Sequence, residues 1–481
     1  RGRNVATWNS IICGYIHQER GVEAFGHFRR MLCESLSPNA ITFVCILKAC
    51  GILKDLHKGI ESHAKIVNEE LLKVNMLICT SLVDMYARCH ALARAQRVFD
   101  CLLFHGIVIW TALIGGYAEN GYGEEALKRF EQMQHEGFYA DAITFASSLK
   151  ACSILKAIDI GLKIHAKAER QGLMQSDVVV GSAIVDMYVK CGSLVIAQAV
   201  FHKLPMRNVV SWTALIVGYA EHGYSEKAIE YFERMQLEGI SPNDHTFVCC
   251  LKACASIGEK EKGKAMHAMI SREGRIEQNL LLGNALIDMY ANCGNLRDAH
   301  KVLEGSYEQN VVTWNALLAG CAKHSDYKTA LKCLDAMKLR NLQPNDVTFV
   351  SVLSLCNHMG LIYEGHRHFR MIKEFDILPT YEHYTCIIDL FGRAGFFNKA
   401  EDILNTMPFL PTIVALVSLL SHCKTYGNAK LATYCYDNLI SMDTGIVLNT
   451  LEMLTFDGFE CGDILEDFQI MCKEQNLAYR G

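Results

Sequence analysis

Four tryptophans divide this chain at equal intervals. Trp8, Trp110, Trp212 and Trp314 are the only tryptophans in 481 residues, and each follows the previous one after 102 residues. The sequence around each tryptophan repeats as well, and self-similarity at a fixed period is the signature of a repeat array. We therefore predict four blocks, a leading tail from a preceding repeat and a divergent extension or cap, with these bounds: 1–4, 5–106, 107–208, 209–310, 311–412 and 413–481.

Each block divides into three pieces, of 35, 35 or 36, and 31 or 32 residues. A piece holds two apolar stretches with helical periodicity, separated by a Gly, Asn or Cys-Gly break. In the piece 209–243, Trp212, Leu215 and Tyr219 lie on the first apolar face and Gly223 ends it. This spacing places one buried face on each helix. Because a single hairpin cannot bury both of its faces, neighbours must stack. The sequence predicts an all-α fold, a right-handed α-solenoid of stacked helix-turn-helix repeats.

Composition narrows the function classes. Lys+Arg 47 against Asp+Glu 52 gives a net charge of −5, which argues against a polycation that coats nucleic acid without selectivity. No apolar run approaches the roughly 18 residues that a membrane helix needs. The 21 cysteines include no CxxC pair, which indicates buried thiols in a reducing compartment. Because the chain begins with Arg1, we interpret it as a fragment or a processed form that carries no targeting peptide.

Polar residues recur at two places in the first and third pieces of each block. The fifth residue of these pieces is always polar, inside the first turn of an otherwise apolar helix. Most of these pieces also end on Asn or Asp. Turn and helix-capping preferences explain the terminal residue without invoking a ligand, but they do not explain the fifth residue. We predict a row of hydrogen-bonding groups along one groove, suited to base recognition at the following residues: Asn9, Asn39, Thr80, Thr111, Asp141, Ser182, Asn208, Thr213, Asn243, Asn284, Asn310, Asn315, Asn345 and Thr385.

Basic residues recur at helical register. In the second pieces, the fifth residue is apolar or small, and a lysine follows one turn later in three of the four blocks. In the third pieces a basic residue occupies the thirteenth place in three of the four blocks, with Asn292 in the other. A cationic stripe of this kind can meet phosphates, although solvated basic residues at helix ends are the alternative. The predicted phosphate-binding residues are Lys48, Arg88, Lys150, Lys190, Lys252 and Arg393.

Three sets of motifs then carry a family resemblance. The first pieces contain VATWNSIICGYI, IVIWTALIGGYA, VVSWTALIVGYA and VVTWNALLAGCA. The second contain TFVCILKAC and its equivalents, and the third contain TSLVDMYARC, SAIVDMYVKCG, NALIDMYANCG and TCIIDLFGRAG. The chain resembles plant pentatricopeptide repeat (PPR) proteins of the mixed-length subclass, in which P, L and S repeats alternate. The first, second and third pieces of each block are accordingly called P-like, L-like and S-like, and each block is a P-L-S triplet. The tetratricopeptide alternative lacks its W-x₂-L-G-x₂-Y pattern here, and a helical array of unknown ligand is the general alternative.

The resemblance implies sequence-specific binding of single-stranded RNA in an organelle. In the family the residue at position 5 and the last residue of a repeat select the base, with RNA running 5′ to 3′ along the repeats. The implied footprint is C-n-R-G-n-A-A-n-C-C-n-R, where n marks an L-like repeat and R a purine. Thr80 pairs with Gly106 and Thr385 with Thr412, so these two repeats imply only a weak purine preference.

The sequence predicts no enzyme and no cofactor. Some members of the family end in a DYW deaminase domain with an H-x-E and P-C-x-x-C zinc signature. Here H-x-E occurs only at His17-Gln18-Glu19, and P-C-x-x-C is absent. Cys50, Cys152, Cys254 and Cys356 repeat every 102 residues, as do His63, His165 and His267, so we interpret them as packing residues and predict no metal site.

The extension 413–481 resembles a degenerate E-type extension. VSLLSHCKTYGN (417–428) fits its start, but Leu416 stands where Trp is common, and the acidic end, from Glu452 to Asp467, fits loosely. We expect a specificity factor for C-to-U RNA editing that recruits a deaminase-bearing protein through the extension. The alternatives are RNA stabilisation or processing by occupancy, and a protein-interaction scaffold. We expect a mitochondrial location, with the plastid as the second choice, and neither a membrane nor a small-molecule substrate as partner.

Overall fold

The computed structural model describes residues 4–69, 75–102, 104–276, 279–305 and 309–442. In these residues it is all-helical, with 27 helices and no strand. The helices of the first block are α1 (Val5–His17), α2 (Gly21–Cys33), α3 (Ala40–Leu53), α4 (Leu56–Asn68), α5 (Met76–Arg88) and α6 (Leu92–Asp100). Those of the second are α7 (Ile107–Glu119), α8 (Gly123–His135), α9 (Ala142–Leu155), α10 (Ile158–Arg170), the short α11 (Leu173–Ser176), α12 (Val178–Lys190) and α13 (Leu194–Lys203).

The third and fourth blocks continue the pattern. The third holds α14 (Val209–Glu221), α15 (Ser225–Leu237), α16 (Asp244–Ile257), α17 (Lys260–Arg272), α18 (Leu280–Asn292) and α19 (Leu296–Gly305). The fourth holds α20 (Val311–Lys323), α21 (Tyr327–Leu339), α22 (Asp346–Met359), α23 (Ile362–Glu374), α24 (Tyr381–Arg393) and α25 (Phe397–Thr406). One further hairpin, α26 (Ile413–Tyr426) and α27 (Ala429–Met442), follows. The predicted all-α fold of stacked helical hairpins is confirmed.

The first helix of every predicted piece begins at the first residue of that piece. The predicted block starts Val5, Ile107, Val209 and Val311 are each the first residue of a helix. By compactness the chain divides differently, into units Arg1–Ala253 and Cys254–Gly481. The division into triplets therefore stays a prediction, and each unit is described by itself below.

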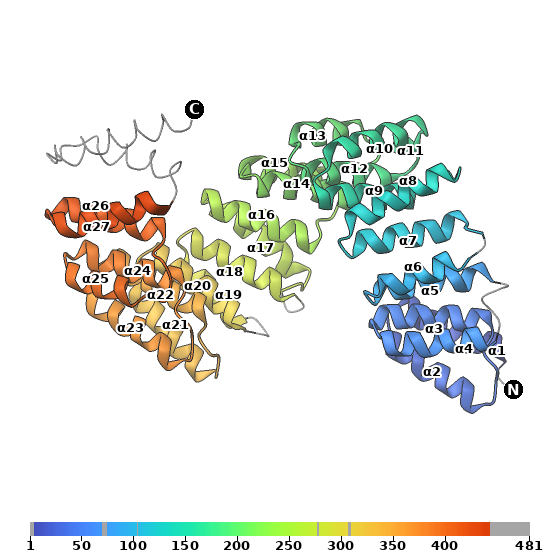
Figure 1. Ribbon diagram of the computed structural model, residues 1–481, viewed down its shortest axis with the longest axis horizontal. Helices are drawn as coiled ribbons and strands as arrows, with labels where there is room; N and C mark the ends of the chain where they lie inside the picture. The colour runs from blue at the N-terminus through green and yellow to red at the C-terminus, as the bar shows by residue number, and fades with distance from the viewer. Residues whose placement is uncertain (1–3, 70–74, 103, 277–278, 306–308, 443–481) are drawn as a thin grey trace. The chain divides into compact units, whose positions relative to one another are not determined.

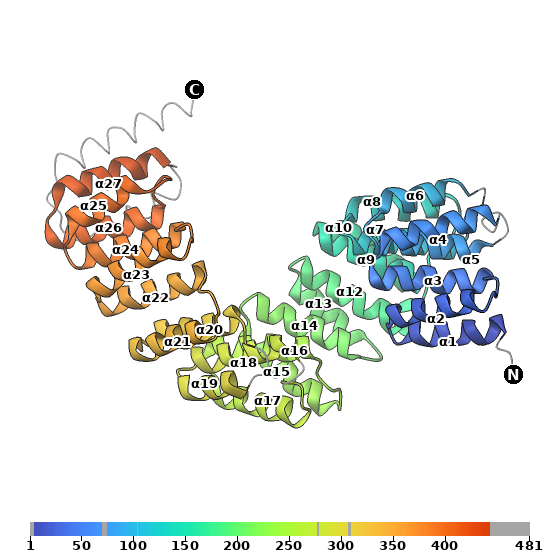
Figure 2. The same cartoon turned by 90° about the horizontal axis from the view of Figure 1, so that it is seen from below.

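Within each unit, successive first helices pack side by side and each second helix packs on its own first helix (Figures 1 and 2). In unit Arg1–Ala253 the row runs through α1, α3, α5, α7, α9, α12 and α14, and in unit Cys254–Gly481 through α18, α20, α22, α24 and α26. The four tryptophans lie fully buried in these rows, as does the phenylalanine of each L-like motif, such as Phe43 and Phe145.

The GxxxH motif of the L-like pieces has a packing explanation. Gly59, Gly161 and Gly263 lie directly against the sulfur of a methionine in the next S-like helix, so that a Cβ at any of them would collide with it. The histidine of each motif bonds to a tyrosine of that helix: His63 Nδ1 to Tyr86 Oη at 2.8 Å, and His165 to Tyr188 and His267 to Tyr290 at 2.9 Å. The motif thus docks the L-like hairpins of the first three blocks onto their neighbours.

The repeated cysteines lie in the core. Cys50, Cys152, Cys254 and Cys356 are buried, and burial raises the pKa of Cys50, Cys152 and Cys356 to about 12. A thiol with a raised pKa stays protonated and unreactive. Their places agree with the interpretation as packing residues. In the described residues no group of three or more His, Cys, Asp or Glu side chains is arranged to hold a metal ion.

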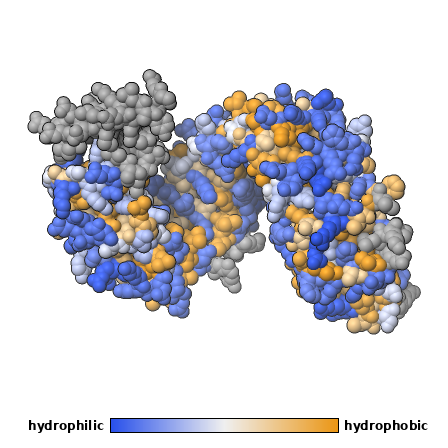
Figure 3. Space-filling view, in the orientation of Figure 1, coloured by the Kyte–Doolittle hydropathy of each residue, from blue (hydrophilic) through white to orange (hydrophobic). Residues whose placement is uncertain are grey.

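Figure 3 shows hydrophilic and hydrophobic residues mixed over the visible face. A membrane-spanning helix would need a longer apolar stretch than any helix in the described part of the chain has.

Candidate nucleic-acid interface

The Asn or Asp that ends a P-like or S-like piece is the N-cap of the next helix. Asn39 Oδ1 accepts hydrogen bonds from Thr42 N and from Thr42 Oγ1, both at 3.0 Å, and Thr42 Oγ1 in return accepts from Asn39 N at 3.1 Å. Capping boxes of this type also begin α14, α20 and α22. Asp141 caps α9 through Thr144 N at 2.8 Å. Satisfying the free N–H groups of a first turn typically stabilises a helix by about 1 kcal/mol.

The side chain at position 5 reaches the same cap. Asn9 Nδ2 donates to Asn39 Oδ1 at 3.0 Å, and Asn9 Oδ1 accepts from Thr42 Oγ1 at 2.7 Å. Asn315 repeats this arrangement with Asn345 and Thr348, at 2.9 and 2.6 Å. The structure therefore brings together the two residues that the sequence paired, through the Thr on the following helix.

The other P-like and S-like pieces use variants of this contact. Ser182 Oγ donates directly to Asn208 Oδ1 at 3.0 Å. Thr111 and Thr213 reach Asp141 and Asn243 through the hydroxyls of Thr144 and Thr246, each 2.7 Å away. Thr313 Oγ1 bridges Asn284 and Asn310, at 2.8 and 2.9 Å.

Two pieces depart from the arrangement. Thr80 donates only to Met76 O of its own helix, and Gly106 offers no side chain beside it. Thr385 and Thr412 are joined hydroxyl to hydroxyl at 3.3 Å. These are the two pieces for which the sequence implied only a weak purine preference.

The predicted position-5 residues are mostly buried, so they have a structural part as well. Asn9, Thr111, Ser182, Thr213 and Asn315 expose at most 9 % of their surface. Each links one hairpin to the next. These hydrogen bonds give a structural reason for a polar fifth residue inside an apolar helix, which capping preferences alone did not explain. A buried polar side chain with its partners in place fixes one arrangement of neighbours.

Capping leaves one polar atom free at each terminal residue. The five asparagines Asn39, Asn208, Asn243, Asn310 and Asn345 use Oδ1 for the cap and leave Nδ2 without a partner among the described residues. Asp141 likewise uses Oδ1 and leaves Oδ2. None of these free atoms is buried. A capped Asn therefore presents a hydrogen-bond donor to solvent, whereas a capped Asp presents an acceptor.

A row of exposed apolar side chains accompanies these atoms, and our sequence prediction missed it. The second residue of ten pieces is apolar and 50 to 68 % exposed. The residues of this apolar row are Ile41, Leu77, Val108, Ile143, Val179, Val210, Leu281, Val312, Val347 and Val414. The sequence signal was present, because the second place is Val, Ile or Leu in all pieces except those with Ala6, His245 and Glu382, although helical periodicity assigns it to the solvent side. Their recurrence at the same place of successive pieces makes them candidate contact residues.

The six predicted phosphate-binding residues fall into two sets. Lys48, Lys150 and Lys252 are exposed and have no ion pair among the described residues. The S-like residues are paired within their own helix, Arg88 with Asp84 at 3.0 Å, Lys190 with Asp186 at 2.8 Å and Arg393 with Asp389 at 2.9 Å.

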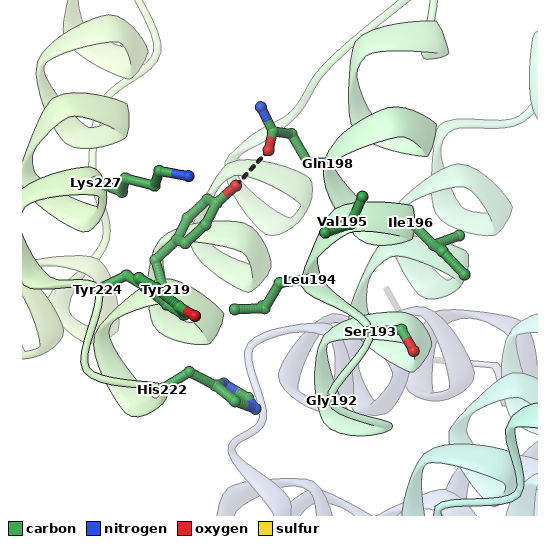
Figure 4. Close-up of a pocket in the computed structure, with 10 residues that line it drawn as sticks. All are labelled: Gly192, Ser193, Leu194, Val195, Ile196, Gln198, Tyr219, His222, Tyr224 and Lys227. Carbon is green, nitrogen blue, oxygen red and sulfur yellow. Dashed lines mark hydrogen bonds between the residues drawn. The ribbon is translucent and has the colours of Figure 1, made fainter.

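A surface hollow in unit Arg1–Ala253 lies apart from these residues. It is formed by α13, α14 and α15, and Figure 4 shows Leu194, Val195, Tyr224 and Lys227 around Tyr219. Tyr219 Oη donates to Gln198 Oε1 at 2.7 Å. The hollow contains none of the residues that the sequence proposed for base or phosphate contacts.

Comparison with known proteins follows the same register. The PPR repeat family matches residues 3–51, 105–153, 207–256 and 309–357, and a second match to the PPR repeat covers residues 284–305 and 382–409. Two mitochondrial pentatricopeptide repeat-containing proteins of Arabidopsis thaliana are 34% and 32% identical to the chain over 92% of its length, which covers 79% and 64% of theirs. A chloroplastic one is 32% identical over 92% of the chain and 51% of its own length. The chain thus spans less than two thirds of two of these relatives.

Solved structures agree on the fold. The crystal structure of the pentatricopeptide repeat protein PPR10 from maize matches with a TM-score of 0.53 at 16% identity, over 93% of this chain and 71% of that one. PPR10 in complex with an 18-nt psaJ RNA element matches with the same TM-score and identity, over 92% and 79%. With the matched residues covering half of the sequence and the helices following the repeat register, the chain belongs to the pentatricopeptide repeat family.

Proposed function

We propose that this chain binds single-stranded RNA and selects its sequence with one base per P-like or S-like piece. The observation that carries the proposal is the free polar atom that capping leaves on each terminal Asn or Asp. Single-stranded RNA is recognised through hydrogen bonds to the Watson–Crick edges of unstacked bases. The solved complex of PPR10 with RNA supports the same use for the fold.

The free atom distinguishes two classes of base. A donor at Asn Nδ2 suits the ring-nitrogen acceptor of adenine or cytosine. An acceptor at Asp141 Oδ2 suits the ring N–H of guanine or uracil. Position 5 then separates the larger base from the smaller one, because the longer amide of Asn9 or Asn315 leaves less room than the hydroxyl of Thr213 does. On this basis the footprint remains C-n-R-G-n-A-A-n-C-C-n-R.

The apolar row supplies affinity that does not depend on the base. Every base has an apolar face, and packing such faces against side chains at regular intervals holds a strand without sequence preference. Residues such as Val108, Val210 and Val312 stand one turn from position 5 on the same helix, so a base that meets the polar pair can also contact them.

The test is a binding assay with this RNA and a shuffled version of it. We expect tighter binding to the designed RNA at moderate salt, since each mismatch at a recognised base typically costs about 1–3 kcal/mol. Equal affinity for both RNAs would refute the assignment of bases to repeats.

Thr213→Asn tests a single position. Asn315 with Asn345 and Thr348 already shows how an Asn fits this place, so the variant should fold and should change the preference at the seventh base from A toward C. Thr213→Ser keeps a hydroxyl and should keep A. An unchanged preference in Thr213→Asn would contradict the role of position 5.

The finer proposal is a specificity factor for C-to-U editing in an organelle, with a deaminase supplied by a partner that the extension recruits. The mitochondrial and chloroplastic relatives support an organelle, with the mitochondrion first. Of the extension, α26 and α27 are described, whereas the acidic residues Glu452 to Asp467 lie outside the described residues. Plants that lack the protein should leave one C unedited, four nucleotides 3′ of the base at the last S-like piece. Altered transcript ends or abundance would instead indicate occupancy, and normal transcripts a protein-interaction scaffold.

A further inference from the structure

Three of the four L-like first helices present a lysine with no oppositely charged residue within one turn on its own helix. Lys48 is the only charged residue of α3, and Lys150 is the only charged residue of α9. In α16, Asp244 lies two turns from Lys252. The residues three and four places from each lysine are apolar or small on both sides, so none can form an intrahelical ion pair. Each lysine is exposed, and its charge is not neutralised within its own helix.

The basic residues of the S-like helices have a different surrounding. Asp84 and Asp186 stand one turn before Arg88 and Lys190 and contact them. The stem of Arg88 also packs against Gly51 of α3. Each pair sums to no net charge, so a phosphate would have to displace a carboxylate that then remains beside it. Neutral pairs release few counterions, and counterion release is the main source of backbone affinity for nucleic acid.

The three lysines lie on the same helix face as the apolar row. Lys48 is at position 9 of its piece, with Ile41 at position 2 and Val44 at position 5, and these places share one face of a helix. Ile41 is exposed, and Val44 offers no hydrogen-bonding group. An L-like helix thus presents an apolar contact and a cation, but nothing that recognises a base edge.

We propose that Lys48, Lys150 and Lys252 bind the phosphodiester backbone of the RNA, one in each of the first three triplets, and that Arg88, Lys190 and Arg393 do not. This inference rests on the proposed RNA binding and assigns the L-like pieces a part in it. In the fourth triplet Ser354 takes the place of the lysine, so the array holds the backbone at three points, all in its first three triplets.

The experiment measures how RNA affinity falls with salt in the whole chain. For single strands each phosphate contact contributes about 0.7 to the slope of log affinity against log salt. The triple variant Lys48→Gln, Lys150→Gln, Lys252→Gln should therefore make this negative slope shallower by about 2. The ratio of affinities for the designed and shuffled RNAs should not change. Ser354→Lys should make the slope steeper by about 0.7.

Two controls separate these contacts from general charge effects. The double variant Lys65→Gln, Lys163→Gln removes exposed lysines from the second helices of the same L-like pieces, α4 and α10, and should leave the slope unchanged. Asp84→Asn with Arg88→Gln, and Asp186→Asn with Lys190→Gln, remove whole pairs at constant net charge and should also leave it unchanged.

Each outcome decides the inference. The inference is overturned if the slope becomes shallower in the pair-removing variants, or if it becomes as shallow in the second-helix variant as in the triple variant. Equal affinity for designed and shuffled RNA with the predicted slopes refutes base selection and retains the phosphate contacts. Selective binding with an unchanged slope in the triple variant refutes the phosphate contacts and retains base selection.

Discussion

The first three triplets and the fourth differ where one hairpin docks on the next. In the first three, the S-like piece meets the following P-like helix through a glycine: Gly116 packs on Ala87, Gly218 on Val189 and Gly320 on Ala291. In the last, α26 of the terminal hairpin carries His422 at the equivalent place, and His422 Nε2 bonds to Asp389 Oδ1 at 2.8 Å. The same backbone arrangement is therefore held by close apolar packing in one region and by a polar network in the other.

Asp389 is the centre of that network. Ser418 Oγ and Asn357 Nδ2 also donate to its carboxylate, and Arg393 Nε does so at 2.9 Å. Burial alone would raise the pKa of Asp389, but the bonds from Ser418, Asn357 and His422, with the charge of Arg393, hold that pKa below its usual value. The equivalent Asp84 and Asp186 contact only the basic residue one turn later. Apolar contact lets similar repeats follow one another, whereas a network of several donors fits one neighbour.

The largest expected effect is the loss of this network. Asp389→Ala leaves buried donors without an acceptor, so we expect the free energy of unfolding of the C-terminal hairpins to fall by about 2–3 kcal/mol. Asp186→Ala removes only an exposed pair and should cost less than about 0.5 kcal/mol. Urea denaturation followed by circular dichroism measures both. Equal losses would show that the last junction is no different from the others.

Glycine substitution tests the apolar junctions. A Cβ at Gly218 would lie 2.5 Å from Val189 Cγ1, so Gly218→Ala should destabilise the chain by about 1–3 kcal/mol through overpacking. Gly14 occupies the same place in the first P-like helix with no described atom within 4 Å. There Gly14→Ala should stabilise by about 0.5–1 kcal/mol, the usual gain in a helix interior. The same sign for both variants would contradict the close approach.

A third comparison uses the histidine–tyrosine pairs, which the fourth triplet replaces with Phe369 and Phe391. Burial lowers the pKa of His165, and the charge of Glu169 offsets this only in part. The neutral imidazole is favoured in the folded chain, so its contribution is present above the unfolded pKa of about 6.5 and is lost as pH falls. His165→Phe with Tyr188→Phe replaces both hydrogen-bonding partners together and should cost at most about 1 kcal/mol at pH 7. Its melting temperature should fall less than that of the wild type between pH 7 and 5, and a parallel fall would refute the argument.

The smallest expected effect is the pH dependence of the stability that Asp389 contributes. Because the pKa of Asp389 is lowered on folding, the stability that its ionised form contributes is present above the unfolded pKa of about 3.9 and is lost as pH falls through the folded value. Asp389→Asn should be less stable than the wild type at pH 7, and the difference in melting temperature should shrink below about pH 4.

Much of the fold was accessible from the sequence. The 102-residue period and the alternation of apolar stretches with breaks predicted where each first helix begins, because a period of this length repeats the caps and the core residues together. The family resemblance paired position 5 with the terminal residue for base selection, but the hydrogen bonds that join the two through the Thr of the next helix were not predicted. The ion pair of Arg88 with Asp84 could have been recognised from its four-residue spacing, and the exposed apolar row from the second residue of each piece.

The sequence by itself determined the repeat unit, its helices and the types of residue that recur in it, since these follow from local spacing and from the need to bury one face of each helix. Only the tertiary structure decided which polar atoms remain free. Capping consumes Oδ1 of Asn39 or Asp141 and leaves the other atom in solvent, and packing of the next hairpin buries Asn9 and Thr213 beside it. Hydrogen bonds between neighbouring hairpins depend on how the hairpins dock, and no spacing along a single helix contains that information.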